Sequence, residues 1–377
     1  MVRISIDKDY LKNTLFALLN IHSPSGYTDQ IVHFVGNELQ NLDIAYNVTR
    51  RGAIRATLKG RESQCDRAIV THLDTLGAMV RKLKPNGRLG IAPIGTWPSR
   101  FAEGGRVTIY KESGPSRGTV LPLKSSGHAF GDGVNTQATD WDNLEVRVDE
   151  DVTDLHSLEQ AGLQVGDFVA FDAFAEISAS GFINARHLDD KAGVAAVLAA
   201  AKGLVVSSTQ LPVDCHLIFT ISEEVGSGAS SAVYGDVGEM VVVDNSPVAP
   251  EQNATEFGVT IGMMDQTGPF DFHLSRKLIK LCQKYDIEME KDLFKYYRSD
   301  SASAIEAGND ARTALACFGV DASHGYERTH ITSLMAVADL MTLYIQSTPT
   351  FSRDKDDMSS LNGFPHQCER DIIQIET

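Results

Sequence analysis

Residues 215–226, Cys-His-Leu-Ile-Phe-Thr-Ile-Ser-Glu-Glu-Val-Gly, join a short apolar run to two adjacent carboxylates. A continuous apolar run of this length is typical of a strand buried on both faces, as in the parallel sheets of α/β proteins. Glu223 and Glu224 follow the run where we expect the strand to end. Because ligands bind beyond the carboxyl ends of such strands, this segment predicts both a sheet and the edge that holds its site.

The same arrangement recurs elsewhere in the chain. Residues 67–71, Arg-Ala-Ile-Val-Thr, lead into His72, and residues 240–243, Met-Val-Val-Val, lead into Asp244. Asp189 stands directly before a helix-forming run of small apolar residues. We therefore expect these polar side chains to meet at one edge of the sheet.

Helical spacing of apolar residues marks the layers that cover this sheet. It runs over residues 9–42 with a break at 22–26, over 192–204, and near 270–285 and 331–345. Strands that alternate with helices predict an α/β fold with a mostly parallel sheet.

A stretch of different character interrupts this alternation. Residues 81–178 contain short alternating segments separated by glycine, which is typical of a small all-β barrel or sandwich. We therefore expect a discontinuous α/β domain, residues 1–80 and 179–350, with an inserted β domain at 81–178 that supports oligomerisation. Residues 351–377 form a polar C-terminal tail.

Bulk composition narrows the class of protein. The 377 residues carry a formal net charge of -16, which disfavours binding to nucleic acid or to an anionic membrane. The N-terminal residues lack the apolar region of a signal peptide, so we expect a cytoplasmic protein. The five cysteines, which include Cys368, are scattered and suggest reduced thiols rather than disulfides or a zinc ribbon.

The residue types at the predicted edge suit a metal centre. Imidazole and carboxylate groups without cysteine suit Zn²⁺, Co²⁺ or Mn²⁺ in a catalytic site. A two-metal centre needs one carboxylate that bridges both ions and two further ligands on each. We assign Asp189 as the bridge, Glu224 and His324 to one metal, and His72 and Asp244 to the other. Three carboxylates and one hydroxide balance the charge of two divalent cations.

Two neighbouring acidic residues receive supporting roles. Glu223 stands next to a predicted ligand without being one, so it is free to take a proton from the bridging water and deliver it to the leaving amine. Asp74 lies two residues beyond His72 and, in an extended segment, falls on the same side, where it could orient the imidazole.

Each predicted ligand also has an ordinary structural explanation when it is taken singly. Asp189 could cap a helix, His72 could be a hydrogen-bonded histidine at a strand end, and Glu224 could lie in a solvated turn. Asp244 could open a turn, and the residues around His324 show no metal-ligand spacing of their own. These ordinary explanations are independent, and all five would have to apply at once if there were no metal centre. The metal centre is therefore favoured.

Five segments carry a family resemblance, and in chain order they are His72-Leu-Asp-Thr-Leu-Gly77, Leu188-Asp-Asp-Lys-Ala-Gly193, Glu223-Glu-Val-Gly226, Asp244 and His324-Gly-Tyr-Glu327. In content and order they resemble the motifs of the M42 family of metallo-aminopeptidases, which includes glutamyl aminopeptidases and tetrahedral self-compartmentalising enzymes. The resemblance covers residues 10–347, and short forms of two motifs also occur in M20 and M28 peptidases. It implies a bridging Asp189, a general-base Glu223, one histidine on each of two metals, and a cis Asp189–Asp190 peptide bond. It also implies a dimer-based homo-oligomer, up to a dodecamer.

The chain departs from the family pattern at two places. Gly325 stands where serine is usual, and Arg298-Ser-Asp300 stands where Gly-Thr-Asp is usual. Arg298 thereby becomes a candidate contact for an acidic side chain or carboxylate of the substrate, although a surface ion pair explains it equally well. These departures and the tail suggest a divergent branch, such as one associated with small glutamine-derived peptide osmolytes.

We predict a hydrolase that removes the N-terminal residue from short peptides, with zinc favoured over cobalt or manganese. A related metal-dependent deacylase or carboxypeptidase-like enzyme would use the same ligands and is a first alternative. A catalytically silent binding protein of the same fold is a second.

Overall fold

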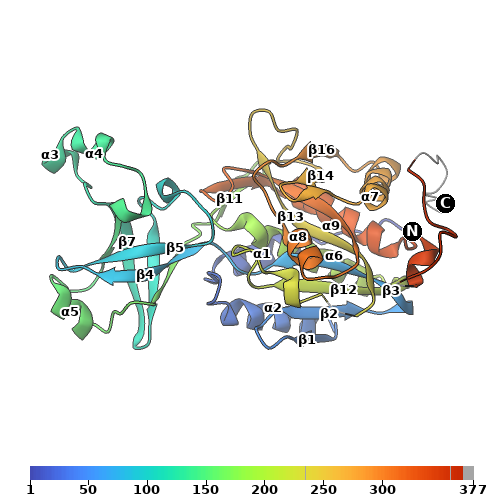
Figure 1. The fold of residues 1–377 in the computed structure, drawn as a ribbon, viewed down its shortest axis with the longest axis horizontal. Coiled ribbons are helices and arrows are strands. Elements are labelled where there is room, and N and C mark those ends of the chain that lie inside the picture. The colour runs from blue at the N-terminus through green and yellow to red at the C-terminus, as the bar shows by residue number, and fades with distance from the viewer. Residues whose placement is uncertain (234, 357, 368–377) are drawn as a thin grey trace.

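The computed structural model describes residues 1–233, 235–356 and 358–367. Within them a twelve-stranded sheet covered by helices forms one part of the molecule, and a closed β-barrel forms the other. Figure 1 shows the barrel projecting to one side of the sheet, with the N-terminus on the opposite side. Cys368 and the last part of the predicted tail lie outside the described residues.

The centre of the sheet consists of four parallel strands. Their apolar residues are buried on both faces, as the continuous runs around Ile69, Ile218 and Val242 predict. In sheet order these strands are β12 (Leu211–Thr220), β3 (Gly60–His72), β13 (Val237–Val248) and β17 (Arg312–Asp321).

Shorter strands extend the sheet on both sides, and most of them pair antiparallel. The sheet is therefore mixed: it is parallel at its centre and mainly antiparallel at its margins. These strands are β1 (Tyr46–Val48), β2 (Ile54–Leu58), β10 (Glu176–Ile177), β11 (Phe182–Ala185), β14 (Val259–Asp265), β15 (Gly268–Pro269), β16 (Met289–Leu293) and β18 (Glu327–His330).

Helices bury the sheet, and the most deeply buried is α6 (Leu188–Val206). Its small alanine, glycine and valine residues let β3, β13 and two other helices approach closely. Because neighbours surround the helix, its apolar residues lie on all sides rather than on one face. The other helices are α1 (Lys8–Leu19), α2 (Asp29–Asn41), α7 (Phe272–Tyr285), α8 (Asp300–Glu306) and α9 (Ile331–Gln346).

The barrel has its own apolar core, separate from that of the sheet. Val107, Val120, Val146 and Val169 point into it from four different strands. The strands are β4 (Gly77–Leu83), β5 (Arg88–Ile94), β6 (Arg106–Lys111), β7 (Gly114–Pro122), β8 (Leu144–Val148) and β9 (Phe168–Phe171), with short helices α3 (Gly127–Phe130), α4 (Gly133–Thr136) and α5 (Leu155–Gln160).

The predicted fold class is confirmed: an α/β sheet domain carries a small inserted β-barrel. Of the two architectures predicted for the insertion, the structure has the barrel. Its first strand begins at Gly77, so the start of β4 falls within the segment predicted for the sheet domain.

Three smaller predictions concern the cysteines, the tail and membranes. Cys65, Cys215, Cys282 and Cys317 are free and buried. The tail is tied to the sheet domain by an ion pair between Asp354 and Arg312, with Asp354 Oδ2 2.6 Å from Arg312 Nε. None of the helices in the described ranges is long and apolar enough to cross a bilayer, and the cytoplasmic location stays a prediction.

A buried ionic network joins β3 to the end of α9. Arg67 is fully buried, and its Nε lies 3.2 Å from a carboxylate oxygen of Glu239. Its Nη1 also donates to the backbone carbonyls of Tyr344 and Ser347, at 2.7 and 2.6 Å, which satisfies acceptors at the end of the helix. Arg67 therefore holds the last helix against the sheet.

We predict that Arg67→Ala lowers the free energy of unfolding by about 3–5 kcal/mol, because Glu239 and the helix carbonyls lose their buried partner. Urea unfolding followed by circular dichroism measures the change. Arg61→Ala, at an exposed position on the same strand, serves as the control and should change it by less than about 0.5 kcal/mol. Equal effects of the two substitutions would contradict the role of the network.

Candidate metal centre

His72 ends β3 at the edge of the sheet, where the strand register aligns it with Thr220 of β12. Its backbone N–H donates to a carboxylate oxygen of Asp190 at 3.1 Å, and the Thr71 hydroxyl donates to the same oxygen. Its Nδ1 lies 2.9 Å from the backbone carbonyl oxygen of Asp74. These contacts turn Nε2 of His72 toward the Asp189 carboxylate.

Asp189 and Asp190 form the entry to α6, and both have non-helical backbone angles. The peptide bond between them is cis, as the family resemblance implied. A Cβ atom at Gly193 would lie 2.1 Å from an oxygen of Asp190, so only glycine fits one turn into the helix. The two side chains separate: Asp190 holds the end of β3, and Asp189 faces the site.

The Asp189 carboxylate contacts both predicted histidine ligands, one with each oxygen. Its Oδ1 lies 3.0 Å from His72 Nε2, and its Oδ2 lies 3.2 Å from His324 Nε2. The Asn245 side chain also donates to Oδ2, at 2.7 Å. Asp189 therefore lies between the two imidazoles, which is the position that a bridging ligand requires.

Glu223 and Glu224 occupy the loop that follows β12. Their backbone N–H groups donate to the buried carboxylate of Asp74, at 3.1 and 3.3 Å, and the Ser25 hydroxyl donates to it as well. Asp74 thus fixes the loop. Its nearer contact with the His72 ring is through its backbone carbonyl, since its carboxylate oxygen lies 3.7 Å from Nδ1.

The far end of this loop is held by Asp300, a buried residue at the start of α8. Its carboxylate accepts from the Thr220 hydroxyl at 2.6 Å and from the Ala229 backbone N–H at 2.7 Å. A Cβ atom at Gly228 would lie 2.1 Å from the same carboxylate. Two aspartates therefore fix the segment that presents Glu223 and Glu224.

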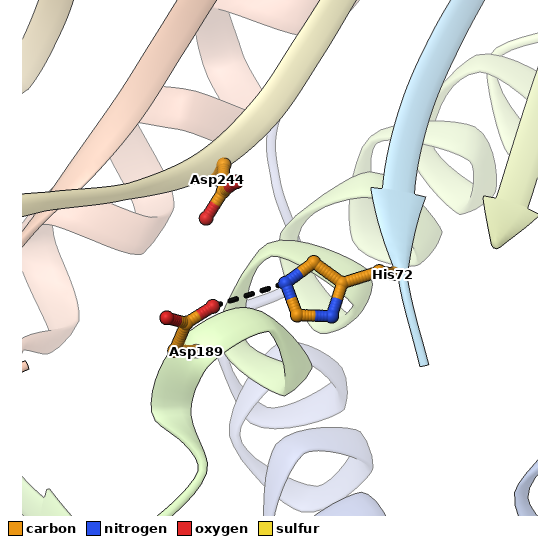
Figure 2. A group of neighbouring side chains, drawn as sticks. All are labelled: His72, Asp189 and Asp244. Carbon is orange, nitrogen blue, oxygen red and sulfur yellow. Dashed lines mark hydrogen bonds and ion pairs between the residues drawn. The ribbon is translucent and has the colours of Figure 1, made fainter. Parts of the chain in front are cut away.

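Asp244 lies inside β13, four residues before its end, rather than after the strand as its sequence context predicted. The strand continues because β13 pairs with β17 as far as Val248. Asp244 is buried, and Figure 2 shows its carboxylate directed toward His72 and Asp189.

His324 lies between β17 and β18 with a left-handed backbone, at a φ of 66°. Its Nδ1 lies 3.1 Å from the backbone carbonyl oxygen of Thr96, a residue of the barrel segment. Its own N–H donates to the buried carboxylate of Glu327 at 3.0 Å. The other oxygen of Glu327 accepts the backbone N–H groups of Leu188 and Asp189, at 2.6 and 3.2 Å. Glu327 thus links the two loops that carry His324 and Asp189.

The five predicted ligands form two groups that share Asp189. One ligand atom from each of His72, Asp189 and Asp244 lies within 4.8 Å of the others. The same holds for Asp189, Glu224 and His324. Figure 2 shows the first group, in which the three residues come from the end of β3, the start of α6 and β13.

Negative charge is concentrated at this site. Burial and the neighbouring Asp189 raise the pKa of Glu224 to about 8 and that of Asp244 to about 7. Burial also raises the pKa of Glu223 well above its usual value. The Asp189 carboxylate behaves differently, because its two imidazole partners outweigh burial and lower its pKa. Clustered carboxylates and imidazoles of this kind fit divalent cations, whose charge would offset the repulsion.

Arg298, the predicted substrate contact, has a carboxylate partner of its own within the chain. Its guanidinium contacts both carboxylate oxygens of Glu306, at 2.9 and 2.5 Å. The ion-pair explanation of Arg298 therefore describes its geometry in this structure.

Comparison with known proteins assigns the family. The sequence profile of the M42 glutamyl aminopeptidases matches residues 52–340, which is more than half of the chain. The chain belongs to the M42 glutamyl aminopeptidase family. This M42 peptidase is therefore a peptide hydrolase, and M42 peptidases are metal-dependent.

Individual relatives agree with this assignment. Putative aminopeptidase YhfE of Bacillus subtilis is 36% identical over 331 residues, which cover 88% of this chain and 95% of that protein. Among solved structures, aminopeptidase APDkam598 from Desulfurococcus kamchatkensis has a TM-score of 0.80 at 21% identity and covers 90% of this chain and 96% of its own. The Pyrococcus horikoshii TET1 peptidase, which can assemble into a tetrahedron or a large octahedral shell, has a TM-score of 0.78 at 21% identity, with coverages of 89% and 99%. The two structures show a shared fold.

We predict that metal affinity rises with pH between 6 and 8. Glu224 and Asp244 hold protons near neutrality in the metal-free protein, because their pKa values are about 8 and about 7. A cation must displace these protons, so affinity should rise by up to about tenfold per pH unit for each proton released. Calorimetric titration with Zn²⁺ in buffers of different ionisation enthalpy measures both quantities. Equal affinities at pH 6 and 8 without proton release would contradict the prediction.

Proposed function

We propose that this M42 peptidase is a two-metal aminopeptidase that removes the N-terminal residue from short peptides. The observation that carries the proposal is the position of Asp189, whose two carboxylate oxygens contact His72 and His324 separately. A carboxylate shared in this way suits two ions side by side.

Two sets of side chains would hold the ions. His72, Asp189 and Asp244 would bind one, and Asp189, Glu224 and His324 would bind the other. When bound, the ions supply positive charge that polarises the scissile carbonyl and favours ionisation of water. Zinc is the metal we favour, with cobalt and manganese as alternatives, since all three accept these ligands.

Glu223 belongs to neither set and is the proposed general base. One of its carboxylate oxygens lies 3.9 Å from His72 Nε2, so it faces the first set of ligands. Its backbone is fixed by Asp74. We assign it the transfer of a proton from the attacking water to the leaving amine. Its raised pKa suits this role, because a base that titrates nearer neutrality both accepts and returns the proton.

We predict that Glu223→Gln keeps the metal content of the wild type and loses about 10²–10⁴-fold in kcat, because the glutamine amide cannot accept the proton. Metal analysis and a panel of aminoacyl-nitroanilides and short peptides measure the two properties. Glu290→Gln, at an exposed position, is the control and should leave both unchanged. N-acetylated peptides test the requirement for a free N-terminus. Full activity of Glu223→Gln would rule out the general-base role, and cleavage of acetylated substrates alone would favour a deacylase.

We also propose that the inserted segment, residues 81–178, supports a homo-oligomer, while residues 1–80 and 179–350 form the catalytic domain. The barrel projects away from the sheet domain and exposes apolar side chains, such as Phe130 at 48% exposure. The similar TET1 peptidase assembles into large shells. If this chain and the TET1 peptidase use the same surface of the barrel for assembly, both would form the same kind of subunit contact.

We predict that light scattering of the full chain gives a mass that is a multiple of 41.0 kDa, at the dimer or above. Phe130→Asp should lower the mass by placing a charge in the interface. Val206→Asp, at a 74% exposed position at the end of α6, is the matched control. A monomeric wild type, or a loss of assembly in Val206→Asp alone, would contradict the proposal.

A further inference from the structure

A small pocket opens beside the Asp189, Glu224 and His324 group, and both parts of the molecule line it. Leu76, Trp97 and Phe171 contribute apolar walls from the barrel side. Arg186, three residues before Asp189, contributes the one arginine among the residues that line the pocket. The pocket therefore places a cation close to the predicted ligands.

Arg186 has few contacts for a half-buried guanidinium. Its Nη2 donates to the backbone carbonyl of Phe101 at 2.7 Å, and its guanidinium carbon lies 5.7 Å from the centre of the Phe171 ring. No carboxylate lies within 4.0 Å of it in the described part of the chain. Arg298 differs, because its guanidinium already forms an ion pair with Glu306.

The acidic residues that share the pocket have other partners. Glu327 accepts three backbone N–H groups, and Asp189 contacts two imidazoles. Burial lowers the pKa of Arg186, and the charge of Glu327 partly offsets this effect. The guanidinium has more donors than the one that the Phe101 carbonyl accepts, and its planar shape matches a carboxylate with two parallel hydrogen bonds.

We propose that Arg186 is a specificity-determining residue that binds a carboxylate of the substrate in this pocket. The inference rests on the proposed aminopeptidase function and adds a substrate feature to it. The carboxylate has two possible sources: an acidic side chain on the N-terminal residue, or the C-terminus of a short peptide. Both offer the same partner to the guanidinium, so only substrate pairs that differ in one carboxylate separate them.

Two such pairs test the proposal with the metal-loaded enzyme. Glutamyl- against glutaminyl-nitroanilide tests the side chain, and Leu-Gly against Leu-glycinamide tests the C-terminus. The wild type should prefer the carboxylate member of at least one pair in kcat/KM. Arg186→Gln should reduce the ratio of kcat/KM between the two members of that pair about 10- to 100-fold. Arg186→Lys should reduce the ratio less, because lysine keeps the positive charge but lacks the two parallel N–H donors of the guanidinium.

Matched variants and a binding measurement complete the test. Arg100→Gln removes an exposed arginine that contacts Thr139 and should leave the ratio unchanged. Thermal unfolding shows whether Arg186→Gln is folded. Leu-Gly and Leu-glycinamide are also titrated calorimetrically into the Glu223→Gln variant and into the Glu223→Gln, Arg186→Gln double variant. The ratio of the two dissociation constants then measures the same preference in the absence of turnover. This measurement still tests Arg186 if the wild type hydrolyses neither pair, an outcome that would contradict only the proposed function.

Three results would overturn the inference. The wild type could show no preference within either pair in hydrolysis or binding. Arg186→Gln could weaken both members of a pair equally. Arg298→Gln, and not Arg186→Gln, could abolish the preference, which would place carboxylate recognition at the other arginine.

Discussion

The mutual repulsion of buried carboxylates is the constraint on which the rest of this structure depends. Asp189, Glu224 and Asp244 come together at one sheet edge, away from water. Such a cluster persists only if positive groups meet it and if the backbone around it is fixed. Imidazoles meet Asp189 from both sides, and divalent ions would complete the compensation.

Other carboxylates fix the backbone. Asp74 and Asp300 hold the two ends of the loop that presents Glu223 and Glu224, and Glu327 joins the loops of Asp189 and His324. Each accepts backbone N–H groups, so these negative charges are used to position the ligands. The geometry of the site therefore depends on acidic residues that would not themselves touch a metal.

Short local patterns predicted most of the fold, and the residues missed are those whose role depends on distant partners. The apolar runs before His72 and Glu223 predicted the central strands, because burial on both faces leaves a continuous signal. The apolar run 240–243 places Asp244 after its strand, whereas pairing with β17 extends the strand through it. Glu327, Asp300 and Asn245 were not recognised as supporting residues. Each has a partner in the site that lies 56 to 139 positions away, and no local pattern records such contacts.

The hydrogen bond from His324 to the Thr96 carbonyl gives the inserted barrel a second consequence. The barrel reaches into the site through this contact, so a shift of the segment after β5 moves the imidazole that would bind a metal. Thermodynamic linkage is reciprocal, so whatever free energy the barrel's position contributes to ion binding would act equally from ion binding on the barrel. The barrel and the sheet domain are therefore coupled through His324 and are not independent modules.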